Sequence, residues 1–341
     1  MAAQHPPSET TNSTPISDQA AKVRSPWLLS FSLLLAAFLL YLTLRGLDWA
    51  VFWETIQTGH YEILFLTIPI VSINYFIRAL RWSVFLQAEK KIPILSVFWA
   101  NMVGYLGNAY LPARAGELLR SGFLGTKTGL GTSFVFATAL AERLLDVIAL
   151  VVIGSIALLW QGHFSPAFAS AVRLMVLAGV FGLLVFIIAP FQEKLILRIF
   201  VALPLPAGIS LKISEQIVRF LTGMRSLHSL RRLLAFILLT AVIWLVDGFA
   251  TTIGARIIGQ TLNLGQALIL LSALGLSSAI PSTPGYVGVY QFVATMVLVP
   301  FGFSRPDALA FILISQILNY LIVSFWGLLG LWQINKSNRG V

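Results

Sequence analysis

Two stretches decide how this chain folds: Leu-Pro-Ala-Arg-Ala-Gly-Glu-Leu-Leu-Arg at Leu111–Arg120, and Ile-Pro-Ser-Thr-Pro-Gly-Tyr-Val-Gly at Ile280–Gly288. Each interrupts an apolar run with the pattern Pro-x-x-x-Gly, which begins at Pro112 and at Pro281. Hydrocarbon cannot hydrate the backbone groups that proline and glycine free, so unwound chain at membrane depth is buried in protein or lines a wet cavity. Paired interruptions in the two halves of a membrane protein therefore indicate a transport site.

The composition is that of an all-α polytopic membrane protein. Of the 341 residues, 57% are hydrophobic and only 11% are charged, and the mean hydropathy is +0.86, which excludes a soluble domain. The chain has room for roughly seven to nine hydrophobic segments of about 20 residues, which leaves little for a soluble catalytic domain. The net charge of +10 lies mainly between apolar runs, where membrane topology explains it better than a nucleic-acid partner does. Because there are no cysteines, disulfides and thiolate metal sites are excluded.

The chain divides into one membrane domain and two short tails. Residues 1–24 are rich in Ser, Thr, Pro and Gln, which predicts a disordered cytoplasmic tail. Residues 25–335 are expected to form a single transmembrane domain. Residues 336–341 are expected to form a second cytoplasmic tail. The uncharged run Trp27–Leu44 is too long for a signal-peptide core, so we expect a retained first span. The basic segment 192–232 has the apolar spacing of an amphipathic helix on a cytoplasmic membrane surface.

Loop charges orient this domain in the cytoplasmic (plasma, or inner) membrane. The segment 192–232 and two groups of basic residues before it should be cytoplasmic, which places both termini inside. These groups are Lys22 with Arg24, and the cluster of Arg78, Arg81, Lys90 and Lys91. If Ile92–Leu111 crossed the membrane completely, the basic residues that follow it, Arg114, Arg120 and Lys127, would lie outside the cell. A re-entrant hairpin that enters from the cytoplasmic side would keep them inside. The second break is compatible with a hairpin from the opposite side. The simplest arrangement is two oppositely inserted re-entrant or broken helices, an inverted pseudo-repeat.

The first break carries charges that suit an anion. Arg114, Glu117 and Arg120 follow one another at three-residue spacing. A helix that begins near Gly116 would offer free N–H groups and the positive end of its dipole to an anion. Glu117 could instead serve as the first-turn acid of that helix.

Three more charges lie within the apolar run Leu130–Trp160. Glu142, Arg143 and Asp146 should be paired and inward-facing, because charge at bilayer depth costs about 2.5 to 3.5 kcal/mol per residue. Glu142 and Asp146 share a helix face and could accept hydrogen bonds from the arginines of the first break. This pairing fits a substrate site and purely structural neutralisation equally well.

Arg78, Arg81 and Asp247 admit two interpretations each. Arg78 and Arg81 share a helix face with Asn74, so they could fork onto a phosphate, or could snorkel to the cytoplasmic interface at the end of a span. Asp247 is the only charge in the interior of its span and could titrate, which would couple transport to protons. It could equally be the partner of an arginine on another helix.

The second break is neutral and rich in small and hydroxyl residues. Its polar chain could form a path for a headgroup or an ion, and packing of helices through small residues is the alternative. The candidate residues here are Ser282, Thr283, Gly285, Gly288 and Gln291, with Ser278 and Tyr290 beside them.

No constellation typical of an enzyme is present in the sequence. The four histidines lie in the tail or in predicted loops without metal-ligand spacing, and nucleotide-binding and nucleophile-elbow motifs are missing. We therefore expect no catalytic residues, no metal and no cofactor. The aromatic residues are interpreted as interfacial belt and packing surface.

Four motifs in order resemble one known family. They are Phe-Ile-Arg-Ala-Leu-Arg-Trp at Phe76–Trp82, the stretch Gly107–Arg120, Ala-Glu-Arg-Leu-Leu-Asp at Ala141–Asp146, and Ile280–Gln291. Together they are similar to the lysylphosphatidylglycerol synthase transmembrane region family, also called the flippase-like or UPF0104 group. In related multiple peptide resistance factor proteins, such a domain translocates aminoacylated phosphatidylglycerol made by a fused synthase domain. Nothing after Trp332 could form that synthase, so the resemblance implies a stand-alone lipid-translocating module.

The resemblance also implies which residues form the site. By motif matching these are Arg78, Arg81, Arg114, Gly116, Glu117, Arg120, Glu142, Arg143, Asp146, Pro284, Gly285 and Gly288. Gln291 departs from the pattern, because the last motif commonly ends in Glu. A mechanism that needs a second carboxylate there is therefore in doubt.

The leading hypothesis is a lipid-translocating protein that binds an anionic or zwitterionic headgroup where the two breaks meet. Its partner would be a membrane phospholipid or lipid-linked substrate, supplied by a separate lipid-synthesis enzyme. The alternatives are a proton- or ion-coupled transporter of a small solute, an intramembrane lipid-modifying enzyme, and a non-catalytic partner of a lipid-synthesis complex.

Overall fold

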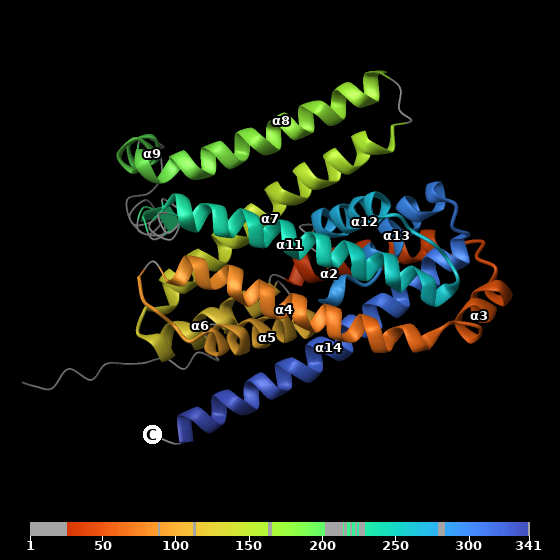
Figure 1. Ribbon diagram of the computed structural model, residues 1–341, viewed down its shortest axis with the longest axis horizontal. Helices are drawn as coiled ribbons and strands as arrows, with labels where there is room; N and C mark the ends of the chain where they lie inside the picture. Colours follow the sequence, from red (N-terminus) through yellow and green to blue (C-terminus); the bar gives the residue numbers. More distant parts are fainter. Residues whose placement is uncertain are drawn as a thin grey trace, which may run out of the picture.

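The computed structural model is built from helices throughout the part of the chain that it describes (Figure 1). That part comprises residues 26–87, 89–111, 114–162, 166–201, 229–278 and 284–339, with single helical positions between 214 and 224. The long helices are α4 (Leu64–Leu86), α7 (Thr132–Gln161), α8 (Pro166–Ile188), α11 (Leu230–Ala255) and α14 (Arg305–Arg339). The shorter ones are α2 (Pro26–Leu44), α3 (Trp49–Gln57), α5 (Ile94–Tyr110), α6 (Gly116–Thr128), α9 (Glu193–Val201), α12 (Leu264–Ser277) and α13 (Val289–Leu298), with 3-10 turns η1 (Tyr61–Ile63), η5 (Arg256–Ile258) and η6 (Pro284–Tyr286).

Five helices of the described residues are long and apolar enough to cross a membrane. A sixth span is possible if α2 and α3, bent by 90° at a short break, are counted as one. The predicted range of seven to nine segments was therefore too loose, because several apolar runs are short helices of the two interrupted elements. Large apolar side chains such as Phe65 and Trp160 are 84% and 86% exposed, as expected for a surface that faces lipid.

The first break forms a helical hairpin. Helices α5 and α6 pack side by side, and they are joined by the break at residues 111–115. The Lys90 ammonium group, just before α5, donates to the carbonyl of Thr128 at the end of α6, 2.7 Å away. Both ends of the hairpin therefore lie together, and its tip points into the molecule.

The second break forms the corresponding hairpin, α12 and α13, which begins at the opposite end of the molecule. The His60 amide, before α4, donates to the carbonyl of Ile257, after α11, so the start of α4 lies beside the end of α11. Helix α5 follows the end of α4, whereas α12 follows the end of α11. The two tips meet inside the protein, where η6 contacts α5.

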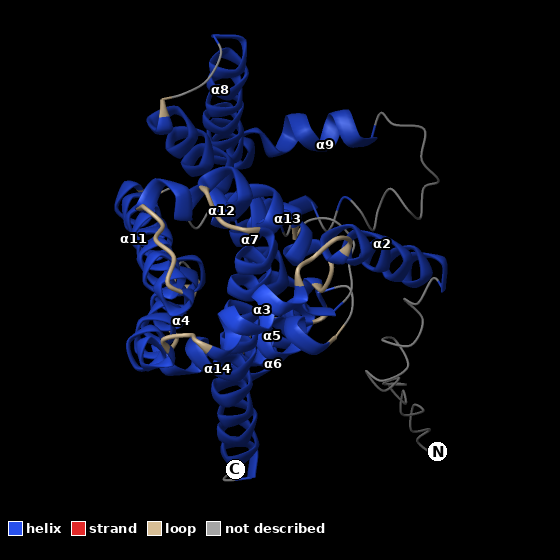
Figure 2. Ribbon diagram, turned by 90° about the vertical axis from the view of Figure 1, so that its right-hand side faces the viewer, coloured by secondary structure: helices blue, strands red, loops and turns tan. Residues whose placement is uncertain are grey.

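Each hairpin packs with its own cluster of buried apolar side chains. The first cluster includes Trp82, Met102 and Leu124, and the second includes Leu270 and Leu298. Helix α8 packs mainly on α7 and lies at one margin of the molecule, opposite the carboxyl-terminal end of α14 (Figure 2). The two hairpins and α4, α7, α11 and α14 therefore surround the centre.

Several predictions fall on residues outside the described part. The tail at 1–24, Pro112, and Pro281, Ser282 and Thr283 of the second break are among them. So is most of the predicted amphipathic segment, for which the structure shows α9 at its start.

Candidate functional site

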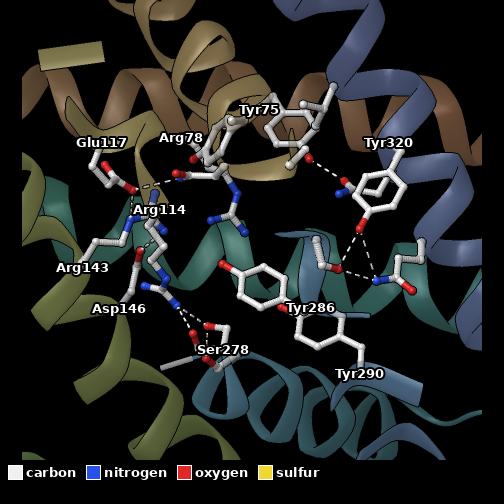
Figure 3. Close-up of a pocket in the computed structure, with 18 of the residues that line it drawn as sticks. Tyr75, Arg78, Arg114, Glu117, Arg143, Asp146, Ser278, Tyr286, Tyr290 and Tyr320 are labelled. Atoms are coloured by element: carbon white, nitrogen blue, oxygen red, sulfur yellow. Dashed lines mark hydrogen bonds and ion pairs between the residues drawn. The ribbon is translucent and has the colours of Figure 1, made fainter. Parts of the chain in front are cut away.

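A cavity of about 260 Å³ lies where the two hairpin tips meet (Figure 3). Its walls come from α4, α5, α6, α7, α11, α12, α13 and α14, and from η6 of the second break. In Figure 3 the charged side chains Glu117, Arg143 and Arg114 gather on one side of the cavity, and Tyr320 lies on the other. The cavity therefore has one charged wall and one aromatic wall.

Beneath the charged wall, Arg81 is completely buried and forms ion pairs with two carboxylates. One of its terminal nitrogens lies 2.5 Å from Asp146, and the other lies 2.9 Å from Glu142. The side chains of Arg81 and Glu142 are both 0% exposed. The snorkelling interpretation of Arg81 was therefore wrong, since its guanidinium is completely buried and held by two carboxylates. Both of its terminal nitrogens are engaged, and its unpaired Nε is buried with them, so Arg81 does not present its guanidinium to the cavity.

Arg120 is also fully engaged. It bridges Glu117 and Glu142 at 2.5 Å and 3.1 Å, donates to the side-chain oxygen of Asn101, and stacks 4.4 Å from the ring centroid of Trp82. Glu142 thus accepts from arginines of two different helices, α4 and α6. This deep network neutralises its own charges and fastens the first hairpin to α4 and α7.

Arg143 and Arg78 are paired but still reach the cavity. Arg143 lies 3.0 Å from Glu117 and 3.4 Å from Asp146, and its side chain is 25% exposed. Arg78 forms an ion pair with Asp247, which also accepts from the amide of Asn74. Asp247 is therefore the partner of an arginine on another helix, the second of the two interpretations above.

Arg114 differs from the other four arginines of the site. Its guanidinium donates to the carbonyl and the hydroxyl of Ser278 at 2.5 Å and 2.7 Å, and no ion pair joins it to a carboxylate among the residues that the structure describes. It lies 6.0 Å from the ring centroid of Tyr286. Arg114 spans the two breaks, because it extends from the first hairpin to the end of α12 and to η6.

The backbone at both breaks is held in an unusual conformation. Arg114 and Tyr286 have φ angles of 53° and 61°, and no other non-glycine residue in the described ranges has a positive φ. Such left-handed residues are disfavoured for side chains with a Cβ and cluster where ligands are held. The strained position of each break therefore lines the cavity.

The charges of the site leave one positive charge in excess. Three arginines and two carboxylates line the cavity: Arg78, Arg114, Arg143, Glu117 and Asp146. When the deep network and Asp247 are included, five arginines face four carboxylates. The excess corresponds to Arg114, since every other arginine has an acidic partner.

Several cavity residues were not identified from the sequence. Tyr75, Tyr105, Tyr320 and Trp244 line the cavity, although aromatic residues had been interpreted as interfacial belt and packing surface. The signal that could have found them is their position, because each lies well inside its apolar segment and belts form at the ends.

Four buried polar atoms on the cavity residues have neither a hydrogen-bond partner nor an ion-pair partner within the described chain. They are the Tyr105 hydroxyl, the Trp244 indole nitrogen, one terminal nitrogen of Arg143 and the side-chain oxygen of Asn108. Buried polar groups are nearly always paired, so four together indicate a polar ligand or water at this place. Three of them are donors or can act as donors, which suits a ligand with acceptor oxygens.

The predicted residues of the second break divide into two groups. Gly285 lines the cavity, and its carbonyl accepts from Gln316 and from the Tyr320 hydroxyl. Gln291 is buried and bonds the amide of Gly288 and the side chain of Gln316, so it stabilises the turn and does not face the cavity. Pro284 begins η6.

Residues of the first break show a similar division. Gly116 starts α6 and packs against the backbone of α5, where a Cβ would collide with the carbonyl of Gly104. It holds the hairpin together. The residues of this break that line the cavity are Arg114 and Glu117.

The chain matches the family model of the lysylphosphatidylglycerol synthase TM region over residues 29–327. It belongs to this family. The matched range contains both hairpins, the deep ion-pair network and the cavity, so the candidate site lies within the family domain.

Two curated relatives are UPF0104 membrane proteins from archaea. The protein from Pyrococcus horikoshii is 26% identical over 314 residues, which cover 84% of this chain and 92% of the relative. The protein from Methanocaldococcus jannaschii is 24% identical over 236 residues, which cover 67% of this chain and 94% of the relative. The family, together with the apolar helices, identifies a multi-pass membrane protein and is consistent with a lipid-related role.

Proposed function

We propose that this protein moves a lipid across the membrane by binding the phosphate of the lipid headgroup in the cavity between the two hairpins. The observation that carries the proposal is Arg114, the one arginine of the site without a carboxylate partner among the described residues. A guanidinium that is held at a cavity wall by neutral acceptors keeps its charge available for an anion.

The remaining contacts fit the oxygens of a phosphodiester. The unpaired terminal nitrogen of Arg143 and the Trp244 indole N–H can donate to phosphate or glycerol oxygens, and the Tyr105 hydroxyl can donate or accept. A phosphodiester carries one negative charge, which the single excess positive charge of the cavity offsets. Binding therefore leaves no uncompensated charge at membrane depth, where such a charge is expensive.

The two hairpins supply a polar route through the bilayer. In this proposal they are re-entrant elements that enter from opposite membrane surfaces, the first from the cytoplasmic side, and their tips replace water around the moving headgroup. The ends of α5 and α6 lie together at Lys90 and Thr128, and the start of α12 lies at the other end of the molecule, which supports this arrangement. The acyl chains stay on the lipid side.

Reconstituted protein tests the proposal directly. Proteoliposomes containing a fluorescent phosphatidylglycerol in one leaflet are assayed for its transfer, with the wild type compared with Arg114→Gln. Charge-assisted hydrogen bonds contribute about 1.5–3 kcal/mol, so the variant should bind the headgroup roughly tenfold to a hundredfold more weakly and translocate it correspondingly slowly at low lipid fraction.

Arg305→Gln is the matched control. Arg305 also donates to main-chain carbonyls, those of Leu42 and Arg45, but at an exposed position outside the cavity. Its translocation rate should equal that of the wild type. Equal rates for Arg114→Gln and the wild type, or a wild-type rate no higher than that of protein-free liposomes, would overturn the proposal.

A further inference from the structure

A second, apolar hollow lies on the outside of the molecule between α5, α6 and α14. This groove has a volume of about 480 Å³, and its floor and walls include Val103, Leu106, Leu119, Leu328 and Leu331. Its two hydroxyl groups, on Tyr110 and Ser324, bond each other at 2.8 Å, and the rest of its lining side chains are apolar. The apolar lining of the groove suits a hydrocarbon chain.

The groove opens toward the outside of the membrane domain. Tyr110, Leu119 and Leu328 are 58%, 44% and 60% exposed, whereas Val103 on the floor is buried. Floor glycine Gly107 lets α6 approach α5, because a Cβ there would lie 2.7 Å from the Cα of Gly116. The groove is therefore a recess between helices that opens at the outer surface of the molecule.

The groove and the polar cavity share the same three helices. On α5 the cavity residues Asn108 and Ala109 are flanked by the groove residues Gly107 and Tyr110. On α14 the cavity residue Val323 is followed by the groove residue Ser324. On α6 Glu117 faces the cavity and Leu119 the groove.

The partition between the two spaces includes a pair of tyrosines. Tyr110 lines the groove and Tyr320 lines the cavity, and their ring centroids are 6.3 Å apart. Side-chain rotation is fast compared with movement of helices, so a pair of rings at the hairpin tip can open without unpacking the fold. Tyr110 is suited to this role, since its ring is largely exposed and bonded only through its hydroxyl to Ser324.

We infer that this groove holds one acyl chain of the lipid whose phosphate lies at Arg114, with Tyr110 and Tyr320 as the lateral opening between chain and headgroup. The inference rests on the proposed function and adds to its headgroup site a separate place for one acyl chain of the lipid. The direction of the groove follows from α14, which packs antiparallel to α5: Gly327 lies against Leu106, and Gly330 against Trp99. From the tip at Tyr110, the groove thus runs toward the end of the molecule at which α5 begins.

Filling the groove tests the inference. Leu328→Trp and Leu331→Trp each place a large ring in the groove at a partly exposed position, where folding should tolerate it. Leu321→Trp is the matched control, because Leu321 lies two turns before Leu328 on the same side of α14, is 64% exposed and does not line the groove. Translocation of fluorescent phosphatidylglycerol should fall at least tenfold in the two groove variants and stay at the wild-type rate in the control.

A binding measurement separates failure of this inference from failure of the proposed function. Glycerophosphoglycerol, the same headgroup without acyl chains, is titrated against detergent-solubilised protein. Its dissociation constant should be unchanged in Leu328→Trp and Leu331→Trp but raised at least tenfold in Arg114→Gln. Equal binding by the wild type and Arg114→Gln would contradict the headgroup site itself.

Photocrosslinking locates the acyl chain of the lipid without a transport measurement. Phosphatidylglycerol with a photoreactive diazirine on one acyl chain should label the segments 103–111 and 324–331 in the wild type, and labelling of both should fall severalfold in Leu328→Trp. Labelling that is the same in Leu328→Trp and Leu321→Trp, or translocation slowed equally in both, would overturn the groove as an acyl-chain site.

Discussion

Replacing Glu142 by glutamine should strongly destabilise this protein. Glu142 is 0% exposed and accepts from Arg81 at 2.9 Å and from Arg120 at 3.1 Å. Glutamine has nearly the same volume, so the change leaves no cavity and removes only the charge and some of the acceptor capacity. The buried guanidinium groups of Arg81 and Arg120 then keep only the carboxylates of Asp146 and Glu117 as acidic partners.

The magnitude follows from the burial of the pair. Removing one partner of a buried ion pair typically costs about 3–5 kcal/mol, because the other charge stays desolvated and uncompensated. The side-chain amide adds a further conflict, since its N–H₂ group faces one of the two guanidinium groups, which are themselves donors only. We therefore expect the free energy of unfolding to fall by about 3–5 kcal/mol.

Denaturation in mixed detergent micelles provides the measurement, with the free energy of unfolding compared among the wild type, Glu142→Gln and Glu62→Gln. Glu62 is the control because its side chain is 72% exposed and its neighbour His60 is also exposed, so its replacement should cost less than about 1 kcal/mol. A loss within about 1 kcal/mol for Glu142→Gln would refute the conclusion that the deep network holds the first hairpin in place.

Three further changes test other parts of the structure. Asp247→Asn removes the acidic partner of Arg78 and should lower the free energy of unfolding by about 2 kcal/mol. The same variant tests the alternative of proton coupling: if its phosphatidylglycerol transfer depends on pH as strongly as that of the wild type, Asp247 does not couple transport to protons. Gln291→Glu places a carboxyl group in a fully buried amide network and should lower the melting temperature in detergent, more so at pH 8 than at pH 5, whereas an unchanged melting temperature at both would contradict this. Gly116→Ala pushes a methyl group against the carbonyl of Gly104 and should cost about 1–3 kcal/mol of unfolding free energy; wild-type stability would show that the two helices of the hairpin can separate freely.

The sequence indicated where charges would be needed but not how they would pair. Local spacing showed that Glu142 and Asp146 share a helix face, and the cost of charge in a membrane required partners for them. Which arginine meets which carboxylate depends on how α4, α6 and α7 pack, because Arg81 and Arg120 lie 61 and 22 residues from Glu142 in the chain. Arg81 and Arg114 illustrate the consequence: both seemed able to bind phosphate, yet only packing shows that Arg81 is enclosed by Glu142 and Asp146 and that Arg114 is not.

The aromatic wall of the cavity illustrates the same limit. A tyrosine within an apolar helix can face lipid, the protein interior or a cavity, and the hydrophobic pattern does not distinguish these when the whole helix is apolar. Tyr75, Tyr105 and Tyr320 come from three different helices. They face one space only because α4, α5 and α14 pack around the hairpin tips.

By itself, the sequence determined that this chain is a helical membrane protein interrupted twice by proline and glycine. The physical reason is local: hydrocarbon tolerates long apolar helices, and unwound chain survives there only when it is enclosed. The sequence also predicted that the two interruptions meet, but tertiary structure alone decided which side chains line the cavity between them, that Arg114 has no carboxylate partner among the described residues, and that an apolar groove lies beside the cavity on α5, α6 and α14. Those features depend on contacts between residues far apart in the chain, because the free energy of a buried charge is set by the partners that packing brings to it.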